Sequence, residues 1–277
     1  MIGKTITELD RVDSTNAFAN LVLSRGEQDE GTVIWAHEQF EGRGQHNHKW
    51  ISKAGKNLTF TVILKPRFLA PDQQFLLNKA VSLSVLDFIR NSLSSNSNSG
   101  IISVVHPAMP ADGQPGIDDN NSFPGISIKW PNDIYIGNKK IGGILIEHKI
   151  MGSSLESSLV GIGLNINQTR FSSEIPNPVS LIQLLHTELS LKEELQSVCR
   201  CLELRYNELR QKNVERLNED YHHALLGFDK WRKFTCKGAI MDGKIKGVDS
   251  LGRLLLESGN GEVRAYNHGE IEYLLSE

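Results

Sequence analysis

Short apolar runs and longer amphipathic stretches follow one another along the chain, and they predict its strands and helices. Apolar or alternating runs typical of strands occupy residues 5–9, 32–36, 58–64 and 158–166. Apolar residues at three- and four-residue spacing, typical of amphipathic helices, occupy residues 15–24, 71–92, 191–206 and 214–225. Two further strand-rich segments lie within residues 126–147, where Gly137 and Asn138 form a turn pair typical of a hairpin.

The composition of the chain changes in two places. Residues 92–125 are dominated by Ser, Asn, Pro, Gly and Asp, so we expect a surface excursion that is mobile at least in part. Residues 231–275 consist of short alternating runs separated by glycines, which is typical of a small all-β barrel. We therefore expect a main domain over residues 1–228 and a barrel domain over residues 229–277.

Charge and cysteine content narrow the class of protein. The 277 residues carry a net charge of −3, which gives no reason to expect a dedicated nucleic-acid-binding protein. No apolar run approaches the ~18 residues of a membrane span, and the N-terminus lacks the apolar stretch of a secretory signal. Cys199, Cys201 and Cys236 do not have the spacing of a disulfide framework or a structural zinc site. We expect a cytoplasmic protein with reduced thiols.

A polar loop, EGRGQHNHKW, occupies residues 41–50 between two predicted strands. Gly42 and Gly44 allow the backbone to approach a ligand closely, and Arg43 places a permanent cation between them. An anionic ligand suits this loop, although a Gly-x-Gly pattern alone more often only forms a turn. Three histidines in or near the loop lack a Cys or carboxylate partner at metal-binding spacing, so we do not favour a metal site there: His37, His46 and His48.

The motif KWPND, at residues 129–133, combines a charge with a sharp bend. Lys129 ends a predicted strand, and Pro131 prevents that strand from pairing further. Asn132 and Asp133 then present an amide and a carboxylate at the bend. Its tryptophan is better explained by core packing, because an indole is costly to expose.

Two weaker signals follow the hairpin turn. Lys140 precedes Gly142 and Gly143, and the apolar run GIGLN ends at Asn165. A solvated turn charge and the relief of crowding in a buried strand explain these residues equally well when each is taken alone. The chain contains no pattern that singles out a Ser-His-Asp or Cys-His pair, so covalent catalysis by a protein nucleophile has no support.

Taken together, five motifs resemble those of the biotin protein ligases, in the same order and over nearly the whole chain. They are DSTN, EQFEGRGQ with a later Trp, KWPND, KKIGGILIE and GIGLNIN, and a small β barrel follows them. The resemblance implies an α+β fold, with a mixed or antiparallel sheet packed with helices as in class II synthetases, and an SH3-like C-terminal barrel. Only 13 residues precede Ser14, so we expect the short bacterial type without a DNA-binding domain and without repressor activity.

The resemblance also implies a two-step reaction. Biotin and ATP, with Mg²⁺, first give biotinyl-5'-AMP and pyrophosphate. The biotinyl group then passes to one lysine of the biotin carboxyl carrier protein of acetyl-CoA carboxylase or a related carboxylase. Fixed cations and backbone N–H groups are the main requirement, because the first step brings two anions together. We expect no contact with DNA or a membrane, and either a monomer or a homodimer.

Site residues follow from the same resemblance. The biotin-binding residues it implies are Ser14, Thr15, Asn16, Gln39, Gly42, Arg43, Lys140, Gly142 and Gly143. The ATP- and adenylate-binding residues it implies are Gly44, Trp50, Asn132, Lys140 and Asn165. The catalytic residues it implies are Arg43, Lys129, Asp133 and Lys140. Asp133 would hold Mg²⁺ or orient the incoming lysine amine, and both roles stay open.

With this resemblance, we interpret the loop at 41–50 as a lid that closes over the adenylate and excludes water. It departs from the many family members that carry further Arg residues after Gly-Arg-Gly, since this chain has Gln45, His46, Asn47 and His48. Fewer permanent cations predict weaker retention of the adenylate, or retention that depends on pH through the two histidines.

Three other interpretations compete with this one. A lipoate ligase or octanoyl transferase shares the architecture, although the KWPND and K-x-G-G motifs are closer to the biotin branch. The Arg-Gly loop with Trp50 and a barrel also fits a single-strand-binding module, against which the acidic net charge and the scarcity of Arg stand. An inactive biotin-binding protein is the weakest alternative, because Arg43, Lys129, Asp133 and Lys140 are intact.

Overall fold

A large mixed sheet forms the centre of the protein in a computed structural model that describes residues 1–26, 28–45, 49–96 and 125–275. Its strands are β1 (Ile6–Val12), β2 (Val33–Gln39), β3 (Leu58–Leu64), β4 (Ile126–Lys129), β5 (Asp133–Ile136), β6 (Lys139–Met151) and β7 (Ser154–Leu164). They lie in the order β1-β2-β3-β7-β6-β5-β4, with β1 parallel to β2 and the other neighbours antiparallel. The expected mixed sheet is confirmed.

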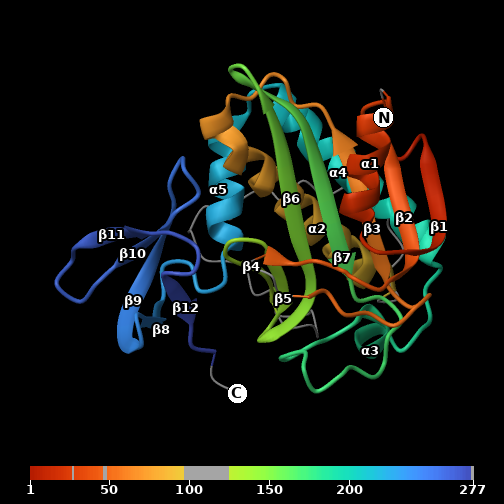
Figure 1. Ribbon diagram of the computed structural model, residues 1–277. Coiled ribbons are helices and arrows are strands. Elements are labelled where there is room, and N and C mark those ends of the chain that lie inside the picture. The colour runs from red at the N-terminus through yellow and green to blue at the C-terminus, as the bar shows by residue number, and fades with distance from the viewer. Residues whose placement is uncertain (27, 46–48, 97–124, 276–277) are drawn as a thin grey trace.

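Helices cover both faces of this sheet (Figure 1). They are α1 (Thr15–Arg25), η2 (Pro71–Gln73), α2 (Gln74–Asn96), α3 (Leu181–Leu185), α4 (Leu191–Arg210) and α5 (Val214–Ala224). Helix α1 packs through Ala19 against Ile34, Ile63 and Leu159 on one face. Helices α2 and α4 pack on the opposite face, where most of the hydrophobic core lies.

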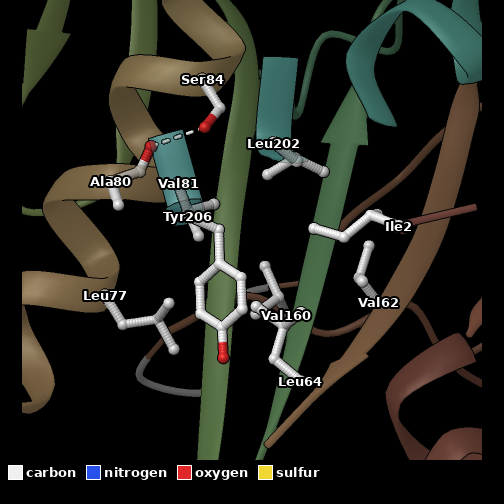
Figure 2. A pocket seen from close by; sticks show the side chains of 10 residues that line it. All are labelled: Ile2, Val62, Leu64, Leu77, Ala80, Val81, Ser84, Val160, Leu202 and Tyr206. Atoms are coloured by element: carbon white, nitrogen blue, oxygen red, sulfur yellow. Dashed lines mark hydrogen bonds between the residues drawn. The ribbon is translucent and has the colours of Figure 1, made fainter. Parts of the chain in front are cut away.

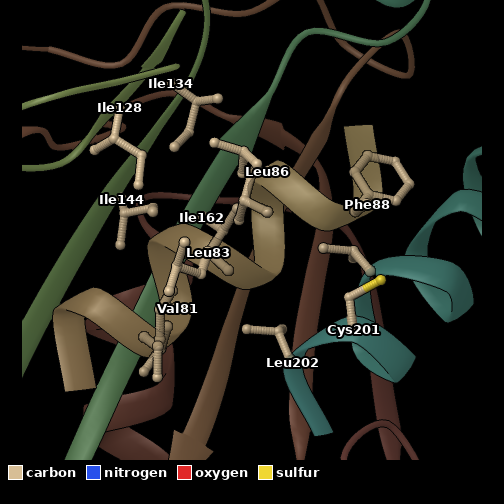
Figure 3. Close-up of a cluster of buried hydrophobic side chains, with 14 of the residues drawn as sticks. Val81, Leu83, Leu86, Phe88, Ile128, Ile134, Ile144, Ile162, Cys201 and Leu202 are labelled. Atoms are coloured by element: carbon tan, nitrogen blue, oxygen red, sulfur yellow. The ribbon is translucent and has the colours of Figure 1, made fainter. Parts of the chain in front are cut away.

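The core lies mainly between α2 and the sheet (Figure 3). Leu83 and Leu86 of α2 are buried against the strands, with Ile128, Ile144 and Ile162 in the same cluster. Between α2, α4 and β3 there is an apolar gap lined by Leu77, Leu202 and Tyr206, among others (Figure 2), and it is too narrow to admit a water molecule. We therefore treat this gap as a packing feature and not as a ligand site.

A second, smaller sheet follows α5. Its strands are β8 (Trp231–Cys236), β9 (Ala239–Val248), β10 (Leu254–Glu257), β11 (Val263–Tyr266) and β12 (Ile271–Tyr273). They lie in the order β11-β10-β9-β8-β12 and are antiparallel throughout, as the alternating glycine-rich pattern predicted. Helix α5 lies between the two sheets (Figure 1). The residues that link α5 to β8 bond to both sheets, so the domain boundary at 228/229 stays a prediction.

Several predicted boundaries were wrong. Strand β2 continues to Gln39, three residues beyond the predicted end at Ala36, because it pairs with β1 as far as Val12. Helix α2 continues to Asn96, into the expected excursion, because Leu93 extends the buried apolar stripe. Residues 97–124 of the excursion lie outside the described residues, so its conformation stays a prediction.

The pattern also missed the first part of one strand and one short helix. Residues 154–157 extend β7 beyond the predicted start at Ser158, and they form a hairpin with the end of β6. The short helix α3 lies between the predicted strand at 158–166 and the predicted helix at 191–206, and the pattern did not indicate it as a separate element. Polar residues on the hairpin arms conceal an alternating pattern, since little of this hairpin end is buried.

The predicted reduced thiols are confirmed, because all three cysteines are free. Burial raises the pKa of Cys199 to about 12 and that of Cys201 to about 11, so both behave as inert core groups. None of the described helices combines the length and the apolar character that crossing a membrane requires.

Lys79 is a buried cation where α2, α5 and the small sheet meet. The residue is 3% exposed, and its Nζ donates to Oδ1 of Asn218 at 2.8 Å. The same Nζ lies 5.6 Å from the ring centroid of Phe75 and 5.5 Å from that of Tyr221. Burial lowers the pKa of Lys79 to about 8, and the charge of Asp249 opposes this shift.

We expect this lysine to make stability rise at alkaline pH. Between pH 8 and the ~10.4 of an exposed lysine, the unfolded chain binds more protons at this position than the folded chain. The free energy of unfolding should therefore gain about 3 kcal/mol from this group across that window. In Lys79→Met the gain should be absent and stability at pH 7 should be higher, as urea unfolding at pH 7 and 9.5 would measure.

Lys192→Met on the exposed surface of α4 is the matched control, and it should keep the wild-type dependence on pH. A Lys79→Met variant with an unchanged pH dependence would contradict the assignment.

Candidate active site

Two charged residues and two glycines form one row across the large sheet. Lys129 of β4 is paired with Asp133 of β5, Asp133 with Gly143 of β6, and Gly143 with Gly163 of β7. Because paired residues of neighbouring strands point to the same side of a sheet, this row lies on one face. It is the face that α1 covers, since Leu159 of β7 lies in the same alternation as Gly163 and packs on α1.

A β-bulge brings Lys140 to this face. The register of β5 and β6 shifts so that Ile134 pairs with Gly142 and Tyr135 with Lys140, which leaves Ile141 as an extra residue. Ile141 is buried in the core, whereas strict alternation from Gly143 would have turned Ile141 away from the core and pointed Lys140 into it. Nζ of Lys140 instead lies 2.7 Å from Oδ1 of Asp133.

The position opposite this ion pair is a glycine. A Cβ on Gly143 would lie 3.3 Å from Oδ1 of Asp133 and 3.5 Å from Nζ of Lys140. Gly142 faces the other way, because a Cβ there would lie 2.6 Å from Cδ2 of Leu164. Of the two predicted glycines, only Gly143 therefore shares a face with the charged pair.

A short segment, residues 177–179, lies outside the sheet and holds the bulge in place. The N–H of Lys140 donates to the carbonyl of Asn177, and the N–H of Val179 donates to the carbonyl of Lys140. Nδ2 of the buried Asn165 donates to the carbonyl of Val179 at 3.0 Å. Asn132 is also buried and donates to the carbonyl of Ile144. Both predicted asparagines therefore use their amide nitrogens to hold the backbone of the site.

The start of α1 and the end of β2 meet beside the row. Ser14 is buried at the N-cap of α1, but its hydroxyl does not cap the helix. Oε1 of Gln39 accepts a hydrogen bond from the backbone N–H of Thr15 at 2.7 Å and lies 3.1 Å from the Thr15 hydroxyl. With its oxygen used in this way, Gln39 has its Nε2 hydrogens to offer as donors.

Asn16 connects α1 to the middle of the sheet. Its Nδ2 donates to Glu147 at 2.7 Å, and its Oδ1 accepts from the Thr61 hydroxyl at 2.6 Å. Gly161 allows this approach, because a Cβ there would lie 2.5 Å from Oδ1 of Asn16. Asn16 thus serves as a structural link within the site.

The glycine loop folds over the end of β7. The N–H of Trp50 donates to the carbonyl of Gly42 at 2.9 Å, and Arg43 forms an isolated bridge with Lys49. The indole lies directly over Gly163, where a Cβ would be 2.3 Å from Cε2 of Trp50. Nε1 of Trp50 is buried and has no hydrogen-bond partner among the described residues.

Arg43 is exposed and Gly44 is half-buried, so neither is enclosed in the site. His46 and His48 lie outside the described residues, so their expected effect on adenylate retention stays a prediction. Among the residues that the structure describes, no group of His, Cys, Asp or Glu side chains is suited to hold a metal ion on its own.

Lys129 lies between two aromatic rings at the end of the row. Its Nζ is 5.6 Å from the ring centroid of Tyr135 and 5.7 Å from that of Tyr273 in the small sheet. Burial lowers the pKa of Lys129, and the neighbouring charge of Lys140 lowers it further, while Asp133 and Glu272 raise it. The ammonium group is therefore partly desolvated and depends on its neighbours for stabilisation.

The predicted motifs meet through a continuous chain of contacts. Nζ of Lys140 lies 6.0 Å from the ring of Trp50, and the loop that carries Trp50 contacts Gln39, which binds the start of α1. Sequence reasoning missed Thr61 and Glu147, which hold Asn16. The alternation of Thr59 and Thr61 with apolar residues in β3 was a signal for a polar position on this face.

Residues 8–165, more than half of the chain, match the profile of the Biotin/lipoate A/B protein ligase family. The chain belongs to this family. Residues 235–273 match the Biotin protein ligase C terminal domain, which agrees with the predicted SH3-like barrel in the position of the small sheet.

Relatives within the family align along almost the whole chain. The bifunctional ligase/repressor BirA of Bacillus subtilis is 27% identical over 96% of this chain and 74% of its own length. The biotin–[acetyl-CoA-carboxylase] ligase of Mycobacterium tuberculosis is 26% identical over 94% of this chain and 86% of its own length. A solved biotin protein ligase from Aquifex aeolicus, in complex with biotin and ATP, covers 99% of this chain and 100% of its own, with a TM-score of 0.72 and 24% identity. The last comparison supports the fold.

The contact between Trp50 and Gly163 makes a testable prediction about this family member. Gly163→Ala should lower the free energy of unfolding by roughly 1–3 kcal/mol, because the added Cβ overlaps the indole. In a Trp50→Ala background the same change should cost much less, and a double-mutant cycle from urea unfolding measures the difference.

Gly259→Ala is the control, since no atom lies within 4 Å of its Cβ position. Equal costs of Gly163→Ala with and without Trp50 would show that the ring does not lie over β7.

Proposed function

We propose that the protein is a biotin protein ligase. It activates biotin with ATP to biotinyl-5'-AMP and transfers the biotinyl group to a lysine of a carboxylase carrier domain. The observation that carries this proposal is the meeting of the Lys140–Asp133 pair, the Thr15–Gln39 pair and Trp50 on one face of the sheet. The family profile and the match to the Biotin protein ligase C terminal domain favour biotin over lipoate as the substrate.

The first step needs cations, because the biotin carboxylate must attack the α-phosphate of ATP. Lys140 is suited to contact both anions, since its Nζ is held by Asp133 and lies near the ring of Trp50. Lys129 at the end of the same row would add a second, partly desolvated cation. Arg43 is exposed and would reach the phosphates from the loop. Such preorganised charges stabilise the transition state without reorganising at the moment of reaction.

The ureido ring of biotin needs neutral donors and acceptors. The buried Ser14 hydroxyl does not cap its helix, and Gln39 has Nε2 to offer beside the backbone of Gly42. Together with the Thr15 hydroxyl, these groups match a cyclic urea, which has one carbonyl acceptor and two N–H donors.

The adenylate would lie beside the Lys140–Asp133 pair, with Trp50 covering it. Nε1 of Trp50 would serve as a donor, because it has no hydrogen-bond partner among the described residues. With Nδ2 of Asn132 and Asn165 committed to the backbone, their Oδ1 atoms are the acceptors they can present to the adenine amino group. Covering the mixed anhydride protects it from hydrolysis.

Mg²⁺ suits this site as a partner of the ATP phosphates. Asp133 would offer it a carboxylate beside Lys140, and Mg²⁺ commonly uses one or two protein carboxylates while phosphates and waters complete its shell. When bound, the ion would neutralise phosphate charge. In the second step Asp133 is equally placed to accept a proton from the acceptor lysine amine.

The partner we propose is the biotin carboxyl carrier domain of acetyl-CoA carboxylase or a related carboxylase, because relatives are named for that activity. The expectations of a cytoplasmic location, of no contact with DNA, and of a monomer or homodimer remain predictions.

Pyrophosphate exchange into ATP is the decisive experiment. Exchange should require biotin and should not be supported by lipoate or octanoate. Exchange that depends on lipoate would support the rival activity, and salt-dependent binding to oligonucleotides without biotin binding would support the nucleic-acid interpretation.

Replacing Lys140 should abolish most of the first step. We expect Lys140→Gln to lower the rate of biotin-dependent exchange by roughly 10²–10³-fold, because it removes the charge held at 2.7 Å from Asp133. The exposed neighbour Lys139 gives a matched control, and Lys139→Gln should retain the wild-type rate. Similar losses in both variants would argue against a special role for Lys140.

Replacing Gln39 should affect biotin selectively. We expect Gln39→Leu to weaken biotin binding by roughly 10–100-fold, because it removes Nε2 and leaves the Thr15 N–H without its acceptor. The affinity for ATP alone should not change, and isothermal titration of each ligand would measure this. Weakened ATP binding of the same size would point to a general collapse of the site.

A further inference from the structure

The small sheet reaches the candidate active site through its edge strand β12. Tyr273, at the end of β12, has its ring centroid 5.7 Å from Nζ of Lys129. The ring centroid of Tyr135, in the large sheet, lies 5.6 Å from the same Nζ. Lys129 is thus contacted by one aromatic ring from each sheet.

The turn that follows Lys129 is also held by the small sheet. Nε1 of Trp130 donates to the carbonyl of Gly252 at 2.9 Å, and its ring makes an edge contact with His268 at 5.7 Å. The Tyr273 ring packs on Phe234 of β8 with the ring centroids 5.1 Å apart, and its buried hydroxyl has no hydrogen-bond partner among the described residues. Both side chains therefore join the KWPND turn to the small sheet.

Lys129 needs such support more than an exposed lysine does. It is half-buried, and it shares its face with a second cation, Lys140. A lysine side chain is flexible, so its ammonium occupies one position only where neighbours restrict it. An aromatic face near a cation stabilises the cation, and it does so more strongly where the cation is desolvated.

We propose that Tyr273 is a positioning residue for Lys129, so that the adenylation site is built from both sheets and is complete only when the small sheet is docked. The consequence for catalysis rests on the proposed function, since it requires Lys129 to act on the bound phosphates. The contact between Tyr273 and Lys129 does not rest on the proposed function.

The test compares two substitutions at Tyr273. Tyr273→Leu removes the aromatic face, whereas Tyr273→Phe keeps it. We expect Tyr273→Leu to lower kcat of biotin-dependent pyrophosphate exchange by roughly 3–30-fold, the equivalent of the lost cation–π contact, and Tyr273→Phe to stay within about twofold of wild type. Tyr266→Leu, on β11 at the opposite edge of the small sheet, is the control for barrel packing and should retain the rate.

A spectroscopic arm tests the contact without relying on activity. After reductive ¹³C-methylation, the Lys129 signal, identified by its loss in Lys129→Gln, should be displaced upfield by the two rings. Its chemical shift should move toward that of an exposed lysine in Tyr273→Leu and should not change in Tyr273→Phe. Thermal unfolding of each variant reports whether the barrel remains folded.

The outcomes separate the two claims. An unshifted Lys129 signal in Tyr273→Leu, or a Tyr273→Phe variant that loses as much activity as Tyr273→Leu, would overturn the role of the ring. Wild-type protein without biotin-dependent exchange would count against the proposed function, and the methyl signal would still decide whether Tyr273 holds Lys129.

Discussion

One extra residue in β6 determines on which face of the large sheet Lys140 lies. Ile141 must be buried and Lys140 must not, yet strict alternation from Gly143 would have turned Ile141 away from the core and Lys140 into it. The bulge resolves the conflict, because both side chains then reach suitable surroundings. It also leaves the backbone of Lys140 to bond with Asn177 and Val179, which stabilises the bulge from outside the sheet.

The sequence predicted the elements better than their ends. Strong periodicity identified α2, α4, α5 and the glycine-punctuated small sheet, because each buries one clear face. The extension of β2 to Gln39 and the bulge at Ile141 were not predictable, since both depend on pairing with strands distant in sequence. Long-range pairing has no local signature beyond alternation, and at the bulge alternation gives the opposite answer.

The candidate site was predicted through motifs, and the structure qualifies what each motif residue does. Asn16, Asn132 and Asn165 use amide groups to join strands and loops, while Lys140 and Asp133 pair directly on the open face. The partners of the motif residues, such as Thr61 for Asn16 and Tyr273 for Lys129, belong to segments that no motif marks. Chemistry that depends on a single side chain can be predicted from sequence, whereas its support comes from tertiary contacts.

Gly143, Gly161 and Gly163 make room on the sheet for side chains that come from other segments. The Lys140–Asp133 pair, Asn16 and the Trp50 indole each lie within 3.5 Å of the place where a Cβ on the corresponding glycine would be. Three groups from separate parts of the chain are thus admitted to one face through missing side chains. A methyl group at any of these positions would act on the group above it, and so would alter the site without touching a polar residue.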